Sequence, residues 1–248
     1  MQISFFEEFP NSNTLSKLKL IKFQTKLYLA DYSIEGYKQH KKELQKNYKN
    51  LKEVIWWPVL NTYEGYWLSP WSLRRGLLRI FHALQNENVP ILWDAEFPKN
   101  RKLILTQYFK HFKNRRLIRS FFKKYKGQIY TAEYLAENKH LEYNCLTFDP
   151  NKYNNIKVKM MYTSFHPWLT ERLIKKRITK LKEKYKDKIS IGLGVLSRGI
   201  TRKEILITPD HLERDLRICK ELGVKEVIIY QLNGLNKEYL KAINKFSK

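Results

Sequence analysis

Eight short runs of apolar and β-branched residues, separated by longer stretches of helical periodicity, are the feature that most constrains the fold of this 248-residue chain. Such alternation is typical of parallel strands joined by crossover helices. The predicted strands are Ile3–Phe6, Lys26–Ala30, Glu53–Trp57, Pro90–Glu96, Gln128–Glu133, Lys157–Ser164, Ile189–Leu196 and Glu226–Leu232. Eight strands can close into a barrel of about this chain length. We therefore predict an α/β protein with a single (β/α)8 TIM-type barrel domain, residues 1–248.

The segments between these strands carry apolar residues at i, i+3, i+4 and i+7, as amphipathic helices do. The helical segments are 33–49, 72–86, 99–126, 171–186, 210–223 and 236–246. Two units of the pattern are weaker. The first unit has only residues 14–21 for its helix, and the fifth, residues 134–155, offers a short helix followed by a loop. We expect the fifth unit to be irregular.

Composition narrows the class of protein. A hydrophobic content of 43% excludes a disordered chain, and no apolar segment approaches the roughly 20 residues that span a bilayer. We expect a soluble protein without a membrane partner. The N-terminal sequence MQISFFEEFP lacks the basic and apolar regions of a secretory signal, which favours a cytoplasmic location. Cys145 and Cys219 form no C-x-x-C or Cys/His pattern, so we expect no disulfide, metal or cofactor.

The formal charge of +24 favours anionic partners. Between Lys99 and Lys126 there are eleven Lys and Arg residues and no Asp or Glu, interleaved with aromatic residues. This segment could bind nucleic acid. The interpretation we favour is an outer helix with a basic coat, whose aromatic side chains point inward.

Acidic residues gather where the predicted strands end, in contrast to the basic remainder of the chain. Functional side chains of (β/α)8 barrels lie at the carboxyl ends of the strands. The acids at these ends are Glu7, Glu8, Asp31, Asp94, Glu96 and Glu133. Their position predicts a functional site at this end of the barrel.

Asp94 and Glu96 lie two residues apart at the end of the fourth predicted strand. Side chains two apart on a strand face the same way, and burying both against an apolar helix layer would be costly. We therefore expect both to point into the barrel. Two close carboxylates repel, so one retains its proton to higher pH, as a general acid requires.

The sequence around this pair resembles a known family. Asp94, Glu96, Phe97 and Pro98 resemble the end of the chitinase-type motif of family 18 glycoside hydrolases, D-x-x-D-x-D-x-E followed by Tyr-Pro. The sixth strand of that family reads M-x-Y-D, often followed by an aromatic residue and His. This chain has Met160, Met161, Tyr162, Thr163, Phe165 and His166 there. Tyr230 stands at a place comparable to the Trp that ends the eighth strand of the family.

The resemblance implies a glycoside hydrolase acting on N-acetylhexosamine-containing or related glycans. Glu96 would protonate the glycosidic oxygen, and Asp94 would orient the acetamido group of the substrate. Tyr162 would hydrogen-bond the carbonyl of that group while its oxygen attacks the anomeric carbon. No carboxylate lies on the seventh strand, ISIGLGVLSRG, which is compatible with such substrate assistance. Glu133 could instead serve as the second carboxylate of an inverting route.

The chain also departs from the family motif. The two leading aspartates are replaced by Val89 and Leu92, the aspartate of the sixth strand by Thr163, and the S-x-G-G of the third strand by WWPVL. A second set of residues at the strand ends completes the predicted site. The predicted substrate-binding residues are Glu7, Trp57, Trp67, Glu133, His166, Tyr230, Gln231 and Asn233.

Two other functions remain open at this point. Barrel enzymes often hold phosphate on glycine-rich loops after the seventh and eighth strands, and Arg198, Gly199 and Gly234 could do so here. The substrate would then be a small anionic metabolite. The third alternative is a binding protein without catalysis, for nucleic acid or an acidic glycan.

Overall fold

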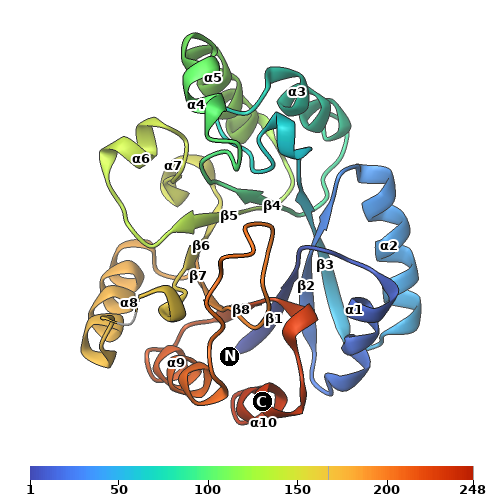
Figure 1. Cartoon of the computed structure of the whole chain (residues 1–248), viewed down its shortest axis with the longest axis vertical. Coiled ribbons are helices and arrows are strands. Elements are labelled where there is room, and N and C mark those ends of the chain that lie inside the picture. The colour runs from blue at the N-terminus through green and yellow to red at the C-terminus, as the bar shows by residue number, and fades with distance from the viewer. Residues whose placement is uncertain (167, 248) are drawn as a thin grey trace. The chain divides into compact units, whose positions relative to one another are not determined.

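Eight parallel strands, paired in chain order, close into one barrel in the computed structural model, which describes residues 1–166 and 168–247 (Figure 1). The strands are β1 (Gln2–Glu7), β2 (Thr25–Asp31), β3 (Leu51–Pro58), β4 (Ile91–Asp94), β5 (Ile129–Tyr134), β6 (Ile156–Met160), β7 (Ile189–Gly194) and β8 (Glu226–Tyr230). The predicted (β/α)8 fold is confirmed.

The chain divides into two compact units. The first contains Met1–Leu29, Lys41–Val54 and Val158–Lys248, and the second contains Ala30–His40 and Ile55–Lys157. Strands β1, β7 and β8 lie wholly in the first unit, and β4 and β5 wholly in the second. The assignment of residues 1–248 to a single domain stays a prediction.

Four strands end earlier than predicted. Strand β4 ends at Asp94 rather than Glu96, β6 at Met160, β7 at Gly194 and β8 at Tyr230. The apolar residues that follow, such as Met161, Leu196 and Leu232, are buried in loops and 3₁₀ turns instead. The sequence pattern therefore overestimates the strands at the end where a site would lie, since an apolar loop residue resembles a strand residue.

Helices connect the strands as the pattern predicts, with the expected irregularities. The helices are α1 (Ser12–Ser16), α2 (Ile34–Asn47), α3 (Arg74–Ala83), α4 (Lys102–Thr106), α5 (Tyr108–Lys124), α6 (Lys139–Tyr143), α7 (Pro150–Tyr153), α8 (Glu171–Tyr185), α9 (Pro209–Glu221) and α10 (Lys237–Asn244). The fifth unit has only the short helices α6 and α7, so its predicted irregularity is confirmed. The basic segment 99–126 contains α4 and α5, separated by Gln107.

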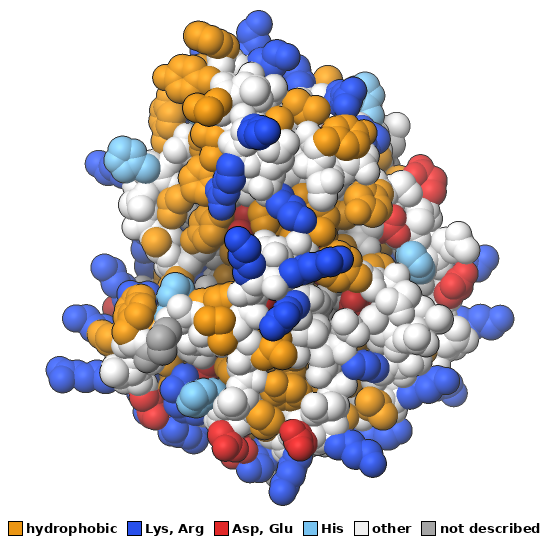
Figure 2. Space-filling model, viewed as in Figure 1, with side chains coloured by type: hydrophobic (Ala, Val, Ile, Leu, Met, Phe, Trp, Pro, Cys, Tyr) orange, Lys and Arg blue, Asp and Glu red, His pale blue; other side chains and the backbone are white. Residues whose placement is uncertain are grey.

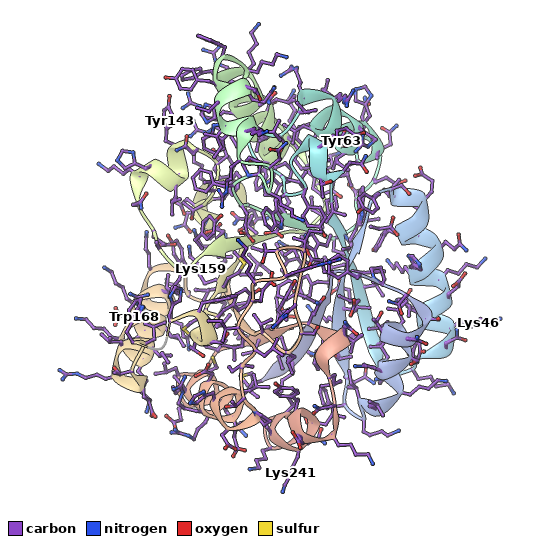
Figure 3. The ribbon with its side chains drawn as sticks, viewed as in Figure 1. Lys46, Tyr63, Tyr143, Lys159, Trp168 and Lys241 are labelled. Carbon is purple, nitrogen blue, oxygen red and sulfur yellow. The ribbon has the colours of Figure 1, made fainter. Side chains whose placement is uncertain are left out.

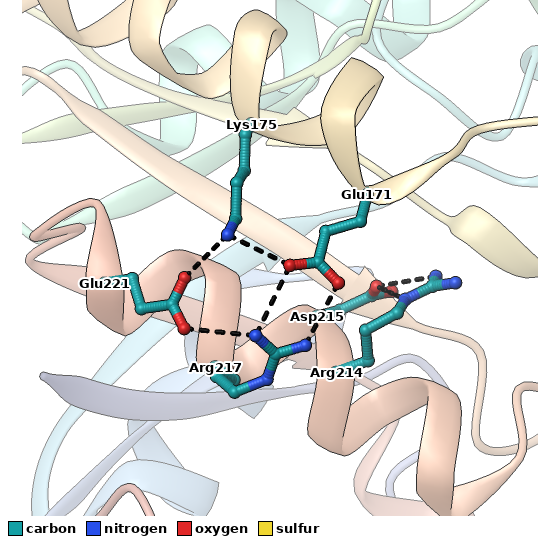
Figure 4. A network of polar contacts seen from close by, with 6 residues as sticks. All are labelled: Glu171, Lys175, Arg214, Asp215, Arg217 and Glu221. Carbon is teal, nitrogen blue, oxygen red and sulfur yellow. Dashed lines mark hydrogen bonds and ion pairs between the residues drawn. The ribbon is translucent and has the colours of Figure 1, made fainter.

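Acidic residues neutralise part of the basic coat on α8 and α9. Arg217 and Lys175 each bind both Glu171 and Glu221, at 2.9–3.1 Å (Figure 4). These four side chains are well exposed, and each such pair contributes little to stability. No helix among residues 1–166 and 168–247 is both long and apolar enough to cross a membrane.

Candidate functional site

The end of strand β4 directs Asp94 into the barrel. Trp93, the preceding residue, packs on the opposite face against the rings of Phe81 from α3 and Phe122 from α5, at 5.9 and 5.2 Å between centroids. Because successive strand residues alternate between faces, Asp94 points away from these helices. Its side chain is buried.

Glu96 lies just beyond the strand, and its neighbour Phe97 ties this loop to strand β5. The Phe97 amide donates a hydrogen bond of 3.1 Å to the hydroxyl oxygen of Tyr134, the last residue of β5. Burial raises the pKa of Tyr134, and the negative charges of Glu96 and Asp94 raise it further. Both carboxylates thus act on one phenol. We call Asp94, Glu96 and Tyr134 the β4 cluster.

Tyr134 is missing from the residues that the sequence pattern selects, although strand parity identifies it. The register pairs Trp93 with Thr131 and Asp94 with Ala132. Paired residues face the same side, so Ala132 and Tyr134 point inward with Asp94. The alternation in IYTAEY could have found this tyrosine.

The same parity places Glu133 on the helix-facing side with Trp93, and its role as a substrate-binding or second catalytic carboxylate stays a prediction. Glu133 is fully buried and accepts hydrogen bonds from Thr147 Oγ1, the Phe148 amide and Lys157 Nζ at 2.5–3.0 Å. Lys157 is also buried and forms a second ion pair with Glu137 at 3.1 Å. Glu133 therefore anchors the irregular fifth unit to β6.

The aromatic residues after β3 are mostly interior. Trp57 and Trp67, predicted to stack on a substrate, are 3% and 8% exposed. Trp71 packs between Phe97 and His111, at 5.0 and 4.6 Å. Tyr63 alone of this group is well exposed (Figure 3). Most of these rings therefore shape the loop beside the β4 cluster and leave little free face for a sugar.

In the first of the two compact units, side chains from β1, β2 and β8 meet around Tyr230. Its ring lies 6.2 Å from Phe6, which in turn lies 5.4 Å from Tyr28, and 5.8 Å from Tyr162 after β6. The Tyr230 hydroxyl donates a hydrogen bond to Glu8. Burial, followed by the charge of Glu8, raises the pKa of Tyr230 well above its usual value. Two of the predicted residues, Tyr162 and Tyr230, are thus brought together.

Glu7, the predicted substrate-binding acid of β1, points away from Tyr230. It is fully buried and accepts hydrogen bonds from the amides of Phe9 and Asn233, at 3.0 and 2.9 Å. Burial raises its pKa to about 7, which these amides only partly oppose. Glu7 and Asn233 therefore join the end of β1 to the turn after β8. The acid that reaches Tyr230 is Glu8.

Gln231, also predicted to bind substrate, forms hydrogen bonds within the protein through both polar atoms of its side chain. The side-chain oxygen of Gln231 accepts from the Glu8 amide at 3.2 Å, and its nitrogen donates to the Arg198 carbonyl at 3.0 Å. The residue is fully buried. Its side chain therefore fixes the loop after β7 to the ends of β8 and β1.

The loops that carry the predicted phosphate site at Arg198, Gly199 and Gly234 already engage two of their amides. The Ile200 amide donates to Glu8 at 3.1 Å, and the Gly234 amide to the Gln231 carbonyl at 3.0 Å. A Cβ on Gly199 would lie 1.8 Å from the Tyr230 hydroxyl, and one on Gly234 would lie 2.2 Å from the Leu196 backbone. The glycines permit close packing, and the Glu8 carboxylate would repel a phosphate.

The residues of the predicted motif that follow β6 have different surroundings. Thr163, which replaces the family aspartate, donates a hydrogen bond of 2.5 Å to Asp215 of α9, so its side chain is engaged with the helix layer. His166 is half-buried, with its ring 5.4 Å from that of the exposed Trp168 (Figure 3). Of the replaced leading acids, Leu92 is fully buried on β4, and the carbonyl of Val89 accepts from Tyr125.

Within residues 1–166 and 168–247, no group of three or more His, Cys, Asp and Glu side chains is arranged to hold a metal ion. No family model matches the sequence, and no curated protein matches it. Solved structures do match its fold.

The glycoside hydrolase domain of PgaB from Bordetella bronchiseptica has a TM-score of 0.58 at 10% identity, covering 100% of this chain and 98% of that one. A GH18 chitinase from Pseudoalteromonas aurantia has a TM-score of 0.54 at 11% identity, covering 99% of both chains. A xylose isomerase domain protein from Planctomyces limnophilus has a TM-score of 0.55 at 10% identity, covering 99% and 94%. The expected resemblance to glycoside hydrolase barrels is therefore confirmed for the fold, which other enzyme classes share.

Proposed function

We propose that this protein is a glycoside hydrolase acting on N-acetylhexosamine-containing glycans, with Glu96 as its general acid. The observation that carries the proposal is the β4 cluster, in which Asp94 is buried at the end of β4 and the Phe97 amide, next to Glu96, is hydrogen-bonded to Tyr134. This is the end of a (β/α)8 barrel at which catalytic side chains lie. The similarity in fold to a chitinase and to a glycoside hydrolase domain supports the same class.

In the proposed reaction, Glu96 gives its proton to the glycosidic oxygen as the bond to the anomeric carbon breaks. The carbonyl oxygen of the substrate acetamido group attacks that carbon from the other side, and Asp94 orients the group through its N–H. Water then opens the cyclic intermediate, and Glu96 takes back a proton from the water. The first step therefore needs Glu96 protonated beside the Asp94 carboxylate, and the second starts with Glu96 as a carboxylate and restores its proton.

Tyr134 suits this division of roles because its hydroxyl can donate a hydrogen bond to a carboxylate at neutral pH. Burial holds the pKa of Tyr134 above its usual value, so the phenol stays protonated at neutral pH. A hydrogen bond donated by this phenol to one of the two acids would favour the charged form of that acid. The sequence resemblance assigns the contact with the acetamido carbonyl to Tyr162, and this assignment stays a prediction.

The alternatives receive less support. A phosphorylated metabolite would need the loop amides after β7, and Glu8 already accepts one of them. Burying an acid is costly, and a purely binding role does not explain why Asp94 is buried at the end of β4.

The experiment is a screen of the purified protein on N-acetylhexosamine oligomers and aryl N-acetylhexosaminides. We expect product release that Glu96→Gln lowers by about 10²–10⁴-fold, the contribution of a general acid. The matched control is Glu87→Gln, which removes a carboxylate that is ion-paired with Lys38 in the same unit. Failure to cleave any of these glycans, or equal loss in both variants, would refute the proposal.

A further inference from the structure

Helices α4 and α5 turn an apolar stripe toward solvent. Leu105, Tyr108, Phe109 and Phe112 follow i, i+3, i+4 and i+7 spacing, and their side chains are 81%, 60%, 87% and 43% exposed. The sequence pattern predicts that the aromatic residues of this segment point inward, and for these three rings it is wrong. Figure 2 shows hydrophobic side chains at the surface in the region that Figure 1 labels α4 and α5. We call these four residues the α4–α5 stripe.

Polar residues occupy the inward face beneath the stripe. Gln107, His111 and Asn114 are buried at positions where an outer helix of a barrel ordinarily carries apolar side chains. Asn114 donates to the carbonyls of Pro70 and Ser72, both at 3.0 Å. Over the first two turns of α5 this arrangement is the reverse of an ordinary amphipathic helix.

The orientation of α5 is fixed, so the stripe cannot turn inward. The Asn114 side chain also accepts from Arg74 of α3 at 3.2 Å, and farther along the helix Phe122 stacks on Phe148 at 3.9 Å. Ile118 between them is fully buried. Rotating the helix would break these contacts, and the stripe therefore stays at the surface.

The stripe is bordered by cations. The exposed basic residues beside it are Arg101, Lys102, Lys110, Lys113 and Arg116. The sequence from Lys99 to Lys126 has no acidic residue that could neutralise them. A second copy of the chain docked through this face would bring two sets of like charges together, which is costly. The partner must therefore offer both negative charge and an apolar phase.

We propose that the α4–α5 stripe and its basic border bind the surface of an anionic lipid bilayer. Leu105 and Phe109 enter the boundary between headgroups and acyl chains, and Lys110 and Lys113 contact the anionic headgroups. Bases of nucleic acid stack on aromatic rings, but the most exposed aliphatic residue, Leu105, has no ring to offer. The expected absence of a membrane partner rested on spanning segments and does not address a surface contact.

The test measures co-sedimentation of the full chain with phosphatidylcholine vesicles, with and without phosphatidylglycerol. A protein of charge +24 is attracted to any anionic vesicle, so the decisive variant leaves the charge unchanged. Replacing both Leu105→Ser and Phe109→Ser should lower partitioning onto the anionic vesicles by about tenfold or more, because each side chain loses its apolar burial. Lys110→Gln with Lys113→Gln should lower it as well, and less so at high salt.

The matched control replaces Ile205→Ser and Tyr32→Ser, an aliphatic and an aromatic residue that are also more than half exposed but lie outside the stripe. We expect wild-type partitioning from this pair. Equal partitioning of the stripe variant and wild type, or no binding to anionic vesicles, would overturn the proposal. Two further results would also overturn it: binding of a single-stranded oligonucleotide, but not of vesicles, through the stripe, and a change of sedimentation coefficient showing self-association through it.

Discussion

Tyr230 donates its hydroxyl hydrogen to the carboxylate of Glu8, although the two residues are 222 positions apart in the sequence. The same carboxylate accepts from the Ile200 amide in the loop after β7. One acid therefore joins the ends of β1 and β8 to that loop. In this unit the network positions Tyr162, whose ring lies against Tyr230.

Tyr230→Phe should destabilise the protein by about 1.5–3 kcal/mol, since it removes a buried hydrogen bond to a charged group. Urea unfolding followed by circular dichroism measures the change. Tyr63→Phe is the control, because that hydroxyl is on a well-exposed side chain and its loss should have little effect. Equal stability of Tyr230→Phe and wild type would contradict the assigned role.

Gly199→Ala should destabilise the fold by about 1–3 kcal/mol through overpacking, because its Cβ would lie 1.8 Å from the Tyr230 hydroxyl and 2.6 Å from Glu8. Gly192→Ala in β7 is the matched control, since the nearest atom to its Cβ would lie at an ordinary 3.5 Å. The comparison uses the same unfolding assay. If the two variants behave alike, the loop does not pack as described.

Glu7 should make the protein less stable as the pH rises from about 4.5 to about 7. The folded state holds the proton of Glu7 up to a pKa of about 7, whereas the unfolded chain releases it near 4.5. The stabilisation is complete below 4.5 and is lost through this window, by about 3 kcal/mol in total.

Glu7→Gln cannot ionise and should remove this dependence, at a cost that does not vary with pH because its amide nitrogen cannot accept from one of the two amides that bind Glu7. The measurement is the difference in unfolding free energy between Glu7→Gln and wild type at several pH values. It should grow in favour of the variant up to about pH 7 and then level off. A difference that stays constant from pH 4.5 to 7 would show that burial does not raise this pKa.

Lys157→Met should destabilise the protein by about 3–5 kcal/mol. It leaves the buried carboxylate of Glu133 without the ammonium group that lies 2.8 Å away. Lys175→Met removes a lysine from the exposed network of Figure 4 and should change stability little. Thermal unfolding of the two variants separates the cases, and a similar melting temperature for both would count against a buried ion pair.

The barrel could be predicted from the sequence because every unit carries its own periodicity. The residues of the site could not be predicted fully, since choosing between neighbours needs the register. Glu7 and Glu8 are chemically alike, and only the direction of β1 makes Glu8 the partner of Tyr230. On β5 the same alternation directs Tyr134, and not Glu133, into the barrel. The sequence pattern makes these strands too long, because buried loop residues such as Leu196 and Leu232 resemble strand residues.

The outward stripe of α5 was missed for a related reason. A pattern of apolar residues at helical spacing indicates one apolar face, but it does not say which face meets the barrel. Asn114 decides this through its hydrogen bonds to the loop before α3. A polar residue at an inward position is visible only once its partners are known.

The most direct test of the central claim, that Glu96 is a general acid, compares two aryl N-acetylhexosaminides that differ in leaving group. A poor leaving group needs a proton as the bond breaks, whereas dinitrophenolate leaves without one. Glu96→Gln should lower kcat/KM by about 10²–10⁴-fold on the poor leaving group and by far less on the dinitrophenyl glycoside. An equal loss on both substrates, or no loss on either, would contradict this role for Glu96.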